Sequence, residues 1–262
     1  MKLWDKGYGT DKIVEKYTVG NDRVLDLKLA KYDVQASLAH ARMLEKAGLL
    51  SKQELQALQK GLAVLMERIE NGTFTIEEDF EDVHSKIEFE LTKMAGEAGK
   101  KIHTARSRND QVLVALHLFL KEELTDIKED IRHLFDTLIA LSNKHKAVLM
   151  PGYTHTQIAM PSSFGLWFAA YAETLIDDLF LLHAAIQTAD QNPLGSAAGY
   201  GSSFPIDRSM TTRELGFATM KYNSVAAQLS RGKLEKTVAF ALASVSGTLS
   251  KLASDMILYL SG

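Results

Sequence analysis

One helical repeat of apolar residues, from Ile102 to Lys146, limits the choice of fold more than any other part of the chain. Apolar residues recur at every third or fourth position, and no glycine or proline interrupts them, so the pattern predicts one long amphipathic helix. At about 1.5 Å per residue such a helix is roughly 60 Å long, which suits a bundle of long helices. Its apolar face comprises Val112, Leu116, Leu120, Leu124, Ile127, Ile131, Leu134, Leu138 and Leu141.

The composition agrees with a globular, all-α protein. Of the 262 residues 46% are hydrophobic and 24% are charged, which allows a sizeable core, and only four are proline. The net charge of -3 gives no electrostatic case for a nucleic-acid partner. No uncharged helical run reaches the ~18–20 residues that span a bilayer, and the first residues lack the apolar run of a signal peptide. Because cysteine is also absent, we expect a cytoplasmic protein with no membrane partner.

Further helical repeats flank the long one. They predict helices over residues 24–46, 51–70, from Pro161 to Asn192, and 224–260, after an irregular start over residues 1–25. Ser51 and Glu54 have the spacing of a capping box at a helix start, and Gly48 is expected to end the helix before it. We therefore expect a small N-terminal helical domain over residues 1–102 and a long-helix bundle over residues 103–262. The segment 239–247 is apolar on nearly every side, which predicts burial against partner subunits.

A dense group of polar residues, His103–Gln111, stands at the start of the long helix. Arg106 and Arg108 each carry a planar guanidinium that can clamp a carboxylate. The backbone N–H groups of the helix start form a further anion site. This segment is interpreted as one wall of an active site; the alternative is a well-capped helix start with surface arginines.

Two histidines are further candidates. His155 lies between Thr154 and Thr156 in a break between helices, and a histidine transfers protons near neutral pH. The alternative is a structural loop histidine. His84 follows a run of acidic residues and shares a helix face with Glu88, although an acidic run is also typical of a solvated helix start.

The loop over residues 192–207 is rich in glycine and serine, and a loop of this length is usually functional or disordered. Its glycine spacing fits no phosphate-binding motif, and Ser202 lacks the GxSxG elbow of a nucleophile. No HExxH or comparable metal spacing occurs in the chain. We expect neither a metal nor a cofactor.

Three segments, His103–Gln111, Pro151–Gln157 and Pro193–Gly199, resemble the argininosuccinate lyase family of the fumarase/aspartase superfamily. The resemblance extends over nearly the whole chain, and the block HTARSRNDQ is its most specific part. It implies a fumarase/aspartase-like helical fold and a homotetramer whose active sites each combine segments from three subunits.

The resemblance also implies a reaction, the reversible β-elimination of argininosuccinate to arginine and fumarate. A base removes a proton beside a carboxylate, the carbanion is stabilised as an aci-carboxylate, and an acid assists the departing guanidinium nitrogen. By motif match, Ser107, Arg108 and Asn109 contact the succinyl carboxylates, and Thr154 binds substrate. His155 is then the acid or an electrostatic and orienting partner, and His84 lines the site.

The chain departs from the family pattern in three places. Asp22 stands in the segment where a serine is expected, and residues 223–232 are less acidic than in many members. The signature loop GSSxMPxKxNP, which carries the serine expected to act as base, is absent and would lie beyond Gly262 with the C-terminal domain. We therefore expect this chain to be the front portion of the enzyme, with little or no lyase activity by itself.

Three other functions remain open. The first is another superfamily lyase, such as one acting on adenylosuccinate, although the HTARSRNDQ block speaks against it. The second is a structural protein, because the δ-crystallins of the lens share this scaffold and a fold alone does not prove turnover. The third is a helical module that binds a small ligand or a protein without turnover. The coding sequence downstream of Gly262 would discriminate best between these possibilities.

Overall fold

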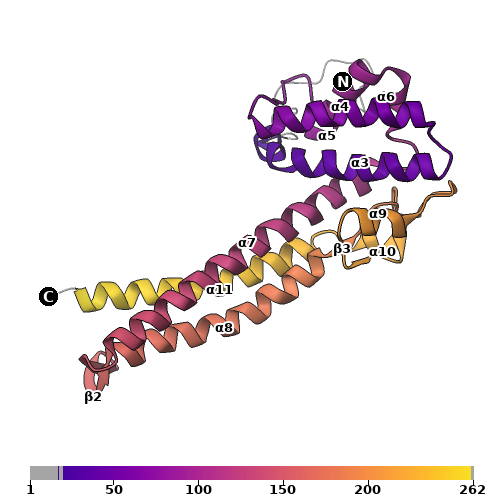
Figure 1. Cartoon of the computed structure of the whole chain (residues 1–262). Coiled ribbons are helices and arrows are strands. Elements are labelled where there is room, and N and C mark those ends of the chain that lie inside the picture. The colour runs from indigo at the N-terminus through magenta and orange to yellow at the C-terminus, as the bar shows by residue number, and fades with distance from the viewer. Residues whose placement is uncertain (1–16, 18–19, 261–262) are drawn as a thin grey trace. The chain divides into compact units, whose positions relative to one another are not determined.

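The computed structural model describes Tyr17 and residues 20–260, and Figure 1 shows that this part of the chain consists mainly of helices. In chain order the elements are α2 (Asp22–Leu25), the 3-10 helix η1 (Asp26–Leu29), α3 (Ala30–Lys46), α4 (Lys52–Glu70), α5 (Val83–Ala95), α6 (Glu97–Lys101), α7 (Arg108–His145), β1 (Leu149–Thr154), β2 (Gln157–Ser163), α8 (Phe164–Ala189), β3 (Gln191–Asn192), α9 (Arg208–Glu214), β4 (Thr219–Met220), α10 (Ser224–Leu229) and α11 (Lys233–Leu260). The predicted helical fold class is confirmed. Most of the irregular start expected over residues 1–25 lies outside the described residues.

The chain forms two compact units. Unit 1 comprises Met1–Phe119 and Asp190–Arg231, and unit 2 comprises Leu120–Ala189 and Gly232–Gly262. The long helix predicted from the apolar repeat is confirmed as α7, whose residues are shared between the units. The domain boundary expected between residues 102 and 103 stays a prediction.

The core of unit 1 is built on α3, α4 and α5, and α3 and α4 lie side by side (Figure 1). The capping box is confirmed, because Ser51 Oγ accepts from Glu54 N at 3.2 Å and Glu54 Oε2 accepts from Ser51 N at 2.8 Å. Gly48 has a φ of +74° after the end of α3, as the sequence predicted. Fully buried side chains of this core include Leu44, Leu58, Leu62, Leu65, Ile87 and Leu91.

The helix predicted over residues 24–46 is divided into α2, η1 and α3. Tertiary contacts occupy the polar side chains of its first two turns. Arg23 donates to the backbone oxygens of Phe80 and Glu78, and Asp26 accepts from Val83 N at 3.2 Å. These contacts fix α2 and η1 against the segment 78–83.

Unit 2 contains residues 120–145 of α7 together with α8 and α11, and the last two helices lie side by side (Figure 1). Their shared core includes Leu124, Ile131, Leu138, Leu175, Leu182, Val238 and Val245. Only one face of α11 is buried in the described chain, since Phe240 is 67% exposed. Burial of the opposite face by partner subunits therefore stays a prediction.

The helix start predicted at Pro161 is wrong. Residues 149–163 form an antiparallel hairpin in which Pro151 pairs with Pro161, and α8 begins only at Phe164. The start signal is Ser163, whose Oγ accepts from Leu166 N at 3.1 Å as an N-cap residue does. Proline, although tolerated in a first helical turn, is equally suited to an exposed strand.

The single helix predicted over residues 224–260 is also wrong, because the chain forms α10 and α11 with a break between them. Asn223 caps α10 by accepting from Ala226 N at 3.0 Å. Gly232 then adopts a φ of +79°, which no residue inside a right-handed helix adopts. None of the described helices is long and apolar enough to cross a membrane.

Candidate functional site

Ser107 directly precedes α7, and its backbone and hydroxyl are both used to begin that helix. Its Oγ accepts from Asn109 N at 3.3 Å, while its own N–H donates to Asp110 Oδ1 at 2.9 Å. These bonds hold the backbone of Ser107–Asn109 at the positive end of a 38-residue helix, where an anion is stabilised.

Asp110 joins this turn to the glycine-rich loop. Its Oδ2 accepts from both Gly195 N and Ala197 N at 2.9 Å, and the side chain is fully buried. Two residues of the segment 224–231 contact these elements separately, one the loop and the other the turn. Gln228 donates to Ser196 Oγ at 3.1 Å, and Arg231 donates to Asn109 O at 3.0 Å.

The loop after Asn192 is fixed by Arg208 as well. This guanidinium donates to the backbone oxygens of Leu194, Lys221 and Tyr222 at 2.9, 2.6 and 3.2 Å. A Cβ at Gly195 would lie 2.7 Å from Arg208 Cγ, so glycine allows the arginine to pass closely over the loop. The loop is thus an anchored support for the start of α7.

Arg108 is partly buried among acidic side chains. Its Nη2 lies 3.3 Å from Glu88 Oε2, and its Nε lies 3.8 Å from Asp82 Oδ2. His103 Nδ1 lies 3.1 Å from the other oxygen of Glu88. Burial alone would raise the pKa of Glu88, but the hydrogen bond to His103 and the charge of Arg108 outweigh it and lower that pKa. A carboxylate bound at Arg108 would therefore share the positive charge of this guanidinium with Glu88.

His84 is 2% exposed and lies inside unit 1, with its Nδ1 2.9 Å from Asp33 Oδ2. Gln111 donates to both oxygens of Asp33 at 3.1 Å, and Ser37 donates to one of them at 3.2 Å. Burial opposes the charge on Asp33, but His84 and the other partners lower its pKa below the ordinary value. His84 is thus a member of a buried polar network.

Arg106 belongs to the same network. It is buried and donates from Nη1 to Ser37 Oγ at 3.0 Å, whereas the sequence suggested a carboxylate clamp. His40 supports the preceding turn, because its Nε2 lies 2.9 Å from the Thr104 oxygen and must donate to it. Burial, with the charge of Arg106, lowers the pKa of His40 to about 3, so this ring is neutral.

Thr154 and His155 lie at the tip of the β1–β2 hairpin in unit 2. Thr154 pairs with Gln157, which leaves His155 and Thr156 as a two-residue turn. Their φ values are +53° and +59°, as a type I′ turn requires. Left-handed backbone costs about 1–2 kcal/mol per non-glycine residue, and strain of this kind clusters at functional sites. The His155 side chain is exposed.

No cluster of three or more histidine, aspartate or glutamate side chains that could hold a metal ion occurs within the described part of the chain. Asp22, which stands where a serine was expected, is exposed in the first turn of α2.

Comparison with known proteins identifies the family. A family model described as Lyase matches residues 7–262. The chain belongs to this lyase family. The predicted family resemblance is thereby confirmed over nearly the whole sequence.

Two curated relatives of this chain illustrate the match. Argininosuccinate lyase of Phocaeicola vulgatus is 56% identical over 259 residues, which are 99% of this chain and 58% of the relative. Argininosuccinate lyase of Thermotoga neapolitana is 44% identical over 98% of this chain and 65% of the relative. The chain thus spans less than two thirds of the length of either relative.

Solved structures confirm the fold of the chain. An EDDS lyase variant with bound fumarate superposes with a TM-score of 0.80 at 26% identity, over 97% of this chain and 50% of that chain. A fumarate lyase:delta crystallin from Brucella melitensis bound to cobalt has the same TM-score at 19% identity, over 97% and 61% of the two chains. The second likeness concerns the fold alone.

Asp33 and Asp110, two buried carboxylates of unit 1, were not predicted as site residues. Asp110 had a local signal, because it stands three residues after Ser107 as the acidic residue of a capping box does. Asp33 had none, since its partners Gln111 and His84 are 78 and 51 residues away along the chain.

Proposed function

We propose that this lyase is an argininosuccinate lyase, which converts argininosuccinate reversibly to arginine and fumarate. The observation that carries the proposal is the 56% identity with the Phocaeicola vulgatus enzyme over 99% of this chain. The polar start of α7 supports it, because the succinyl part of the substrate and the product fumarate each carry two carboxylates that need cationic and N–H donors.

In this proposal Ser107, Arg108 and Asn109 bind the succinyl carboxylates. The turn they form is held by hydrogen bonds to Asp110 and from Arg231, so its donors are oriented before substrate arrives. Donors fixed in advance stabilise the aci-carboxylate without reorganisation during the reaction. His84 acts through the buried network with Asp33 and Gln111, which fixes the first turn of α7 at the side facing α3.

We propose further that Thr154 binds substrate and that His155 is the acid or an orienting partner of the catalytic groups. The exposed position of His155 at the tip of a hairpin supports a role toward a bound molecule. Histidine suits proton transfer at neutral pH. The reaction proposed for these residues needs no metal and no cofactor.

The working assembly is proposed to be a homotetramer in the cytoplasm, with no nucleic-acid or membrane partner. Large apolar side chains are exposed on α8 and α11 of unit 2, among them Leu166, Phe180, Phe240 and Ile257. Exposed apolar surface of this kind marks protein–protein contact. Within the assembly, residues 1–102 are proposed as the N-terminal domain and residues 103–262 as part of the central bundle.

A substrate panel tests the function. Full-length protein is incubated separately with argininosuccinate and with adenylosuccinate, and the ultraviolet absorbance of fumarate is followed. Turnover of argininosuccinate alone, lost in His155→Asn, is the expected result. Turnover of adenylosuccinate would overturn the substrate assignment. A folded protein that releases no fumarate would instead favour a δ-crystallin-like structural role.

A further inference from the structure

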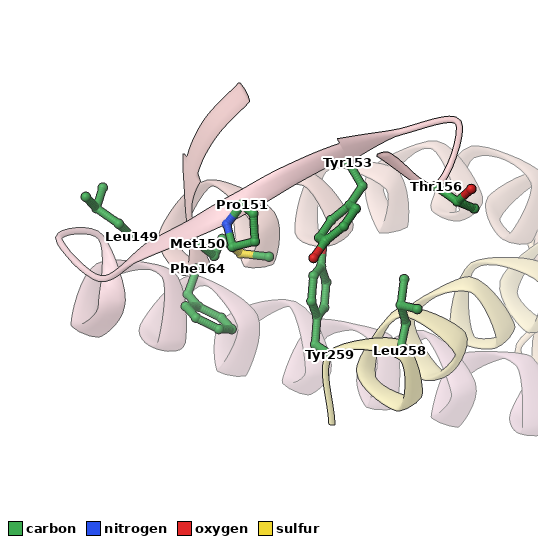
Figure 2. Close-up of a pocket in the computed structure, with 8 residues that line it drawn as sticks. All are labelled: Leu149, Met150, Pro151, Tyr153, Thr156, Phe164, Leu258 and Tyr259. Carbon is green, nitrogen blue, oxygen red and sulfur yellow. The ribbon is translucent and has the colours of Figure 1, made fainter. Parts of the chain in front are cut away.

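The hairpin that carries Thr154 and His155 is largely exposed, yet one ring near its tip rests on another element. The ring centroid of Tyr153 lies 6.1 Å from that of Tyr259, which belongs to the last turn of α11. Figure 2 shows the two side chains pointing toward each other. Tyr153 directly precedes Thr154, so this contact is made one residue away from the proposed pair.

Tyr259 is itself held in place. Its ring lies edge-on to Trp167 of α8, with centroids 5.7 Å apart. One helical turn earlier, Asp255 Oδ2 accepts from Trp167 Nε1 at 3.0 Å and from the Tyr171 hydroxyl at 2.7 Å. Burial and the Asp255 carboxylate raise the pKa of Tyr171, which keeps that hydroxyl protonated as a donor. Two hydrogen bonds to one carboxylate thus fix the surface on which Tyr259 lies.

A cavity of about 540 Å³ adjoins this contact. Its lining, drawn in Figure 2, comprises Leu149, Met150, Pro151, Tyr153, Thr156, Phe164, Leu258 and Tyr259. Because this space lies beside the hairpin, loss of the Tyr259 ring would leave room for the hairpin to move.

We propose that Tyr259, backed by the Trp167–Asp255–Tyr171 cluster, is a positioning residue for Thr154 and His155. This inference rests on the proposed function. Tyr259 acts through Tyr153 and contacts no reacting atom. A displacement of about 1 Å in a catalytic group can lower a rate roughly 100-fold, so a ring that fixes the hairpin affects turnover more than substrate affinity.

Variants of the full-length protein test the proposal by two readouts. Tyr259→Leu removes the ring, Tyr259→Phe keeps it, and Asp255→Ala removes the acceptor behind it. Ser254→Ala is the matched control, because that hydroxyl donates to Ser250 O of its own helix. The readouts are kcat and KM for argininosuccinate, and the hydrogen exchange of backbone amides over residues 149–163.

For Tyr259→Leu and Asp255→Ala we expect kcat to fall about 10- to 100-fold with little change in KM. Amide exchange should accelerate in the hairpin while α8 and α11 keep wild-type exchange. Tyr259→Phe and Ser254→Ala should match the wild type in both readouts. Wild-type kcat and hairpin exchange in Tyr259→Leu would overturn the proposal, and so would acceleration spread over α8 and α11, which marks a purely structural role.

The exchange readout separates this inference from the function on which it rests. If wild-type protein releases no fumarate, the proposed function fails, while the hairpin exchange still reports whether Tyr259 fixes the hairpin. If wild-type protein is active but Tyr259→Leu leaves the hairpin unchanged, the positioning role fails and the proposed function stands.

Discussion

Three backbone N–H groups from two distant segments converge on the carboxylate of Asp110. One belongs to Ser107, in the proposed carboxylate-binding turn, and two belong to the loop at Gly195 and Ala197. A hydrogen bond to a carboxylate is stronger than one between neutral groups, so these three donors tie Asp110 firmly to both segments. Asp110 therefore links the proposed substrate-binding turn to the stability of unit 1.

Asp110→Asn tests this link. The amide keeps one acceptor oxygen but presents N–H donors toward backbone N–H groups, so we expect unfolding in urea to become easier by about 2–3 kcal/mol. KM for argininosuccinate should rise, because the turn at Ser107 loses its support. Asp126→Asn, at an exposed position of the same helix, should change stability by less than about 0.5 kcal/mol. Equal stability of the two variants would contradict the role of Asp110.

His40 makes the stability of the folded chain depend on pH. Its pKa is lowered from 6.5 to about 3, first by burial and then by the charge of Arg106. The unfolded chain therefore binds a proton that the folded chain excludes between these values. The contribution of His40 to the free energy of unfolding is fully present above pH 6.5. It falls with decreasing pH by up to about 1.4 kcal/mol per pH unit.

His40→Gln should remove this slope between pH 6.5 and 5, as measured by urea unfolding at each pH. His133→Gln is the control, because His133 is exposed on α7, and it should keep the wild-type slope. An unchanged slope in His40→Gln would show that another group causes the dependence.

At the scale of elements, local sequence patterns predicted those helices whose position depends on neighbouring residues. The apolar repeat predicted α7, and the Ser51–Glu54 box predicted the start of α4. The hairpin was missed because His155 and Thr156 form its turn without the Asn-Gly pair that usually marks one. The sequence predicted that the turn around Asp110 is polar and part of a site. It did not predict the hydrogen bonds from Gly195 and Ala197, because these residues are 85 and 87 positions away and no local pattern encodes such contacts.

Thr156→Gly relieves the strain of that hairpin turn. Glycine adopts a φ near +59° without steric cost, whereas threonine pays about 1–2 kcal/mol there. After subtraction of the greater entropy of glycine in the unfolded chain, we expect a net stabilisation of about 0.5–1 kcal/mol. Differential scanning calorimetry measures it as a higher Tm. Thr156→Ala, which keeps a Cβ at this φ, should leave Tm close to that of the wild type, and a lower Tm for glycine would refute the strain.

At the scale of the whole molecule, the exposed apolar side chains of unit 2 bear on assembly. Phe180 of α8 and Phe240 of α11 are 71% and 67% exposed, and both are large enough to anchor an interface. The proposed tetramer gives these side chains a partner. It also accounts for the apolar segment 239–247, of which a single chain buries only one face.

Phe240→Glu tests the tetramer directly. A carboxylate introduced at an apolar interface must be desolvated without a partner, so we expect dissociation into smaller species in light scattering coupled to size exclusion. Because Phe240 is exposed in the single chain, the helical circular dichroism of the dissociated protein should stay near that of the wild type. Lys251→Glu, a charge change at an exposed position of the same helix, should leave the mass unchanged. If Phe240→Glu keeps the wild-type mass, this face of α11 is not an interface, and the exposed side chains serve another partner.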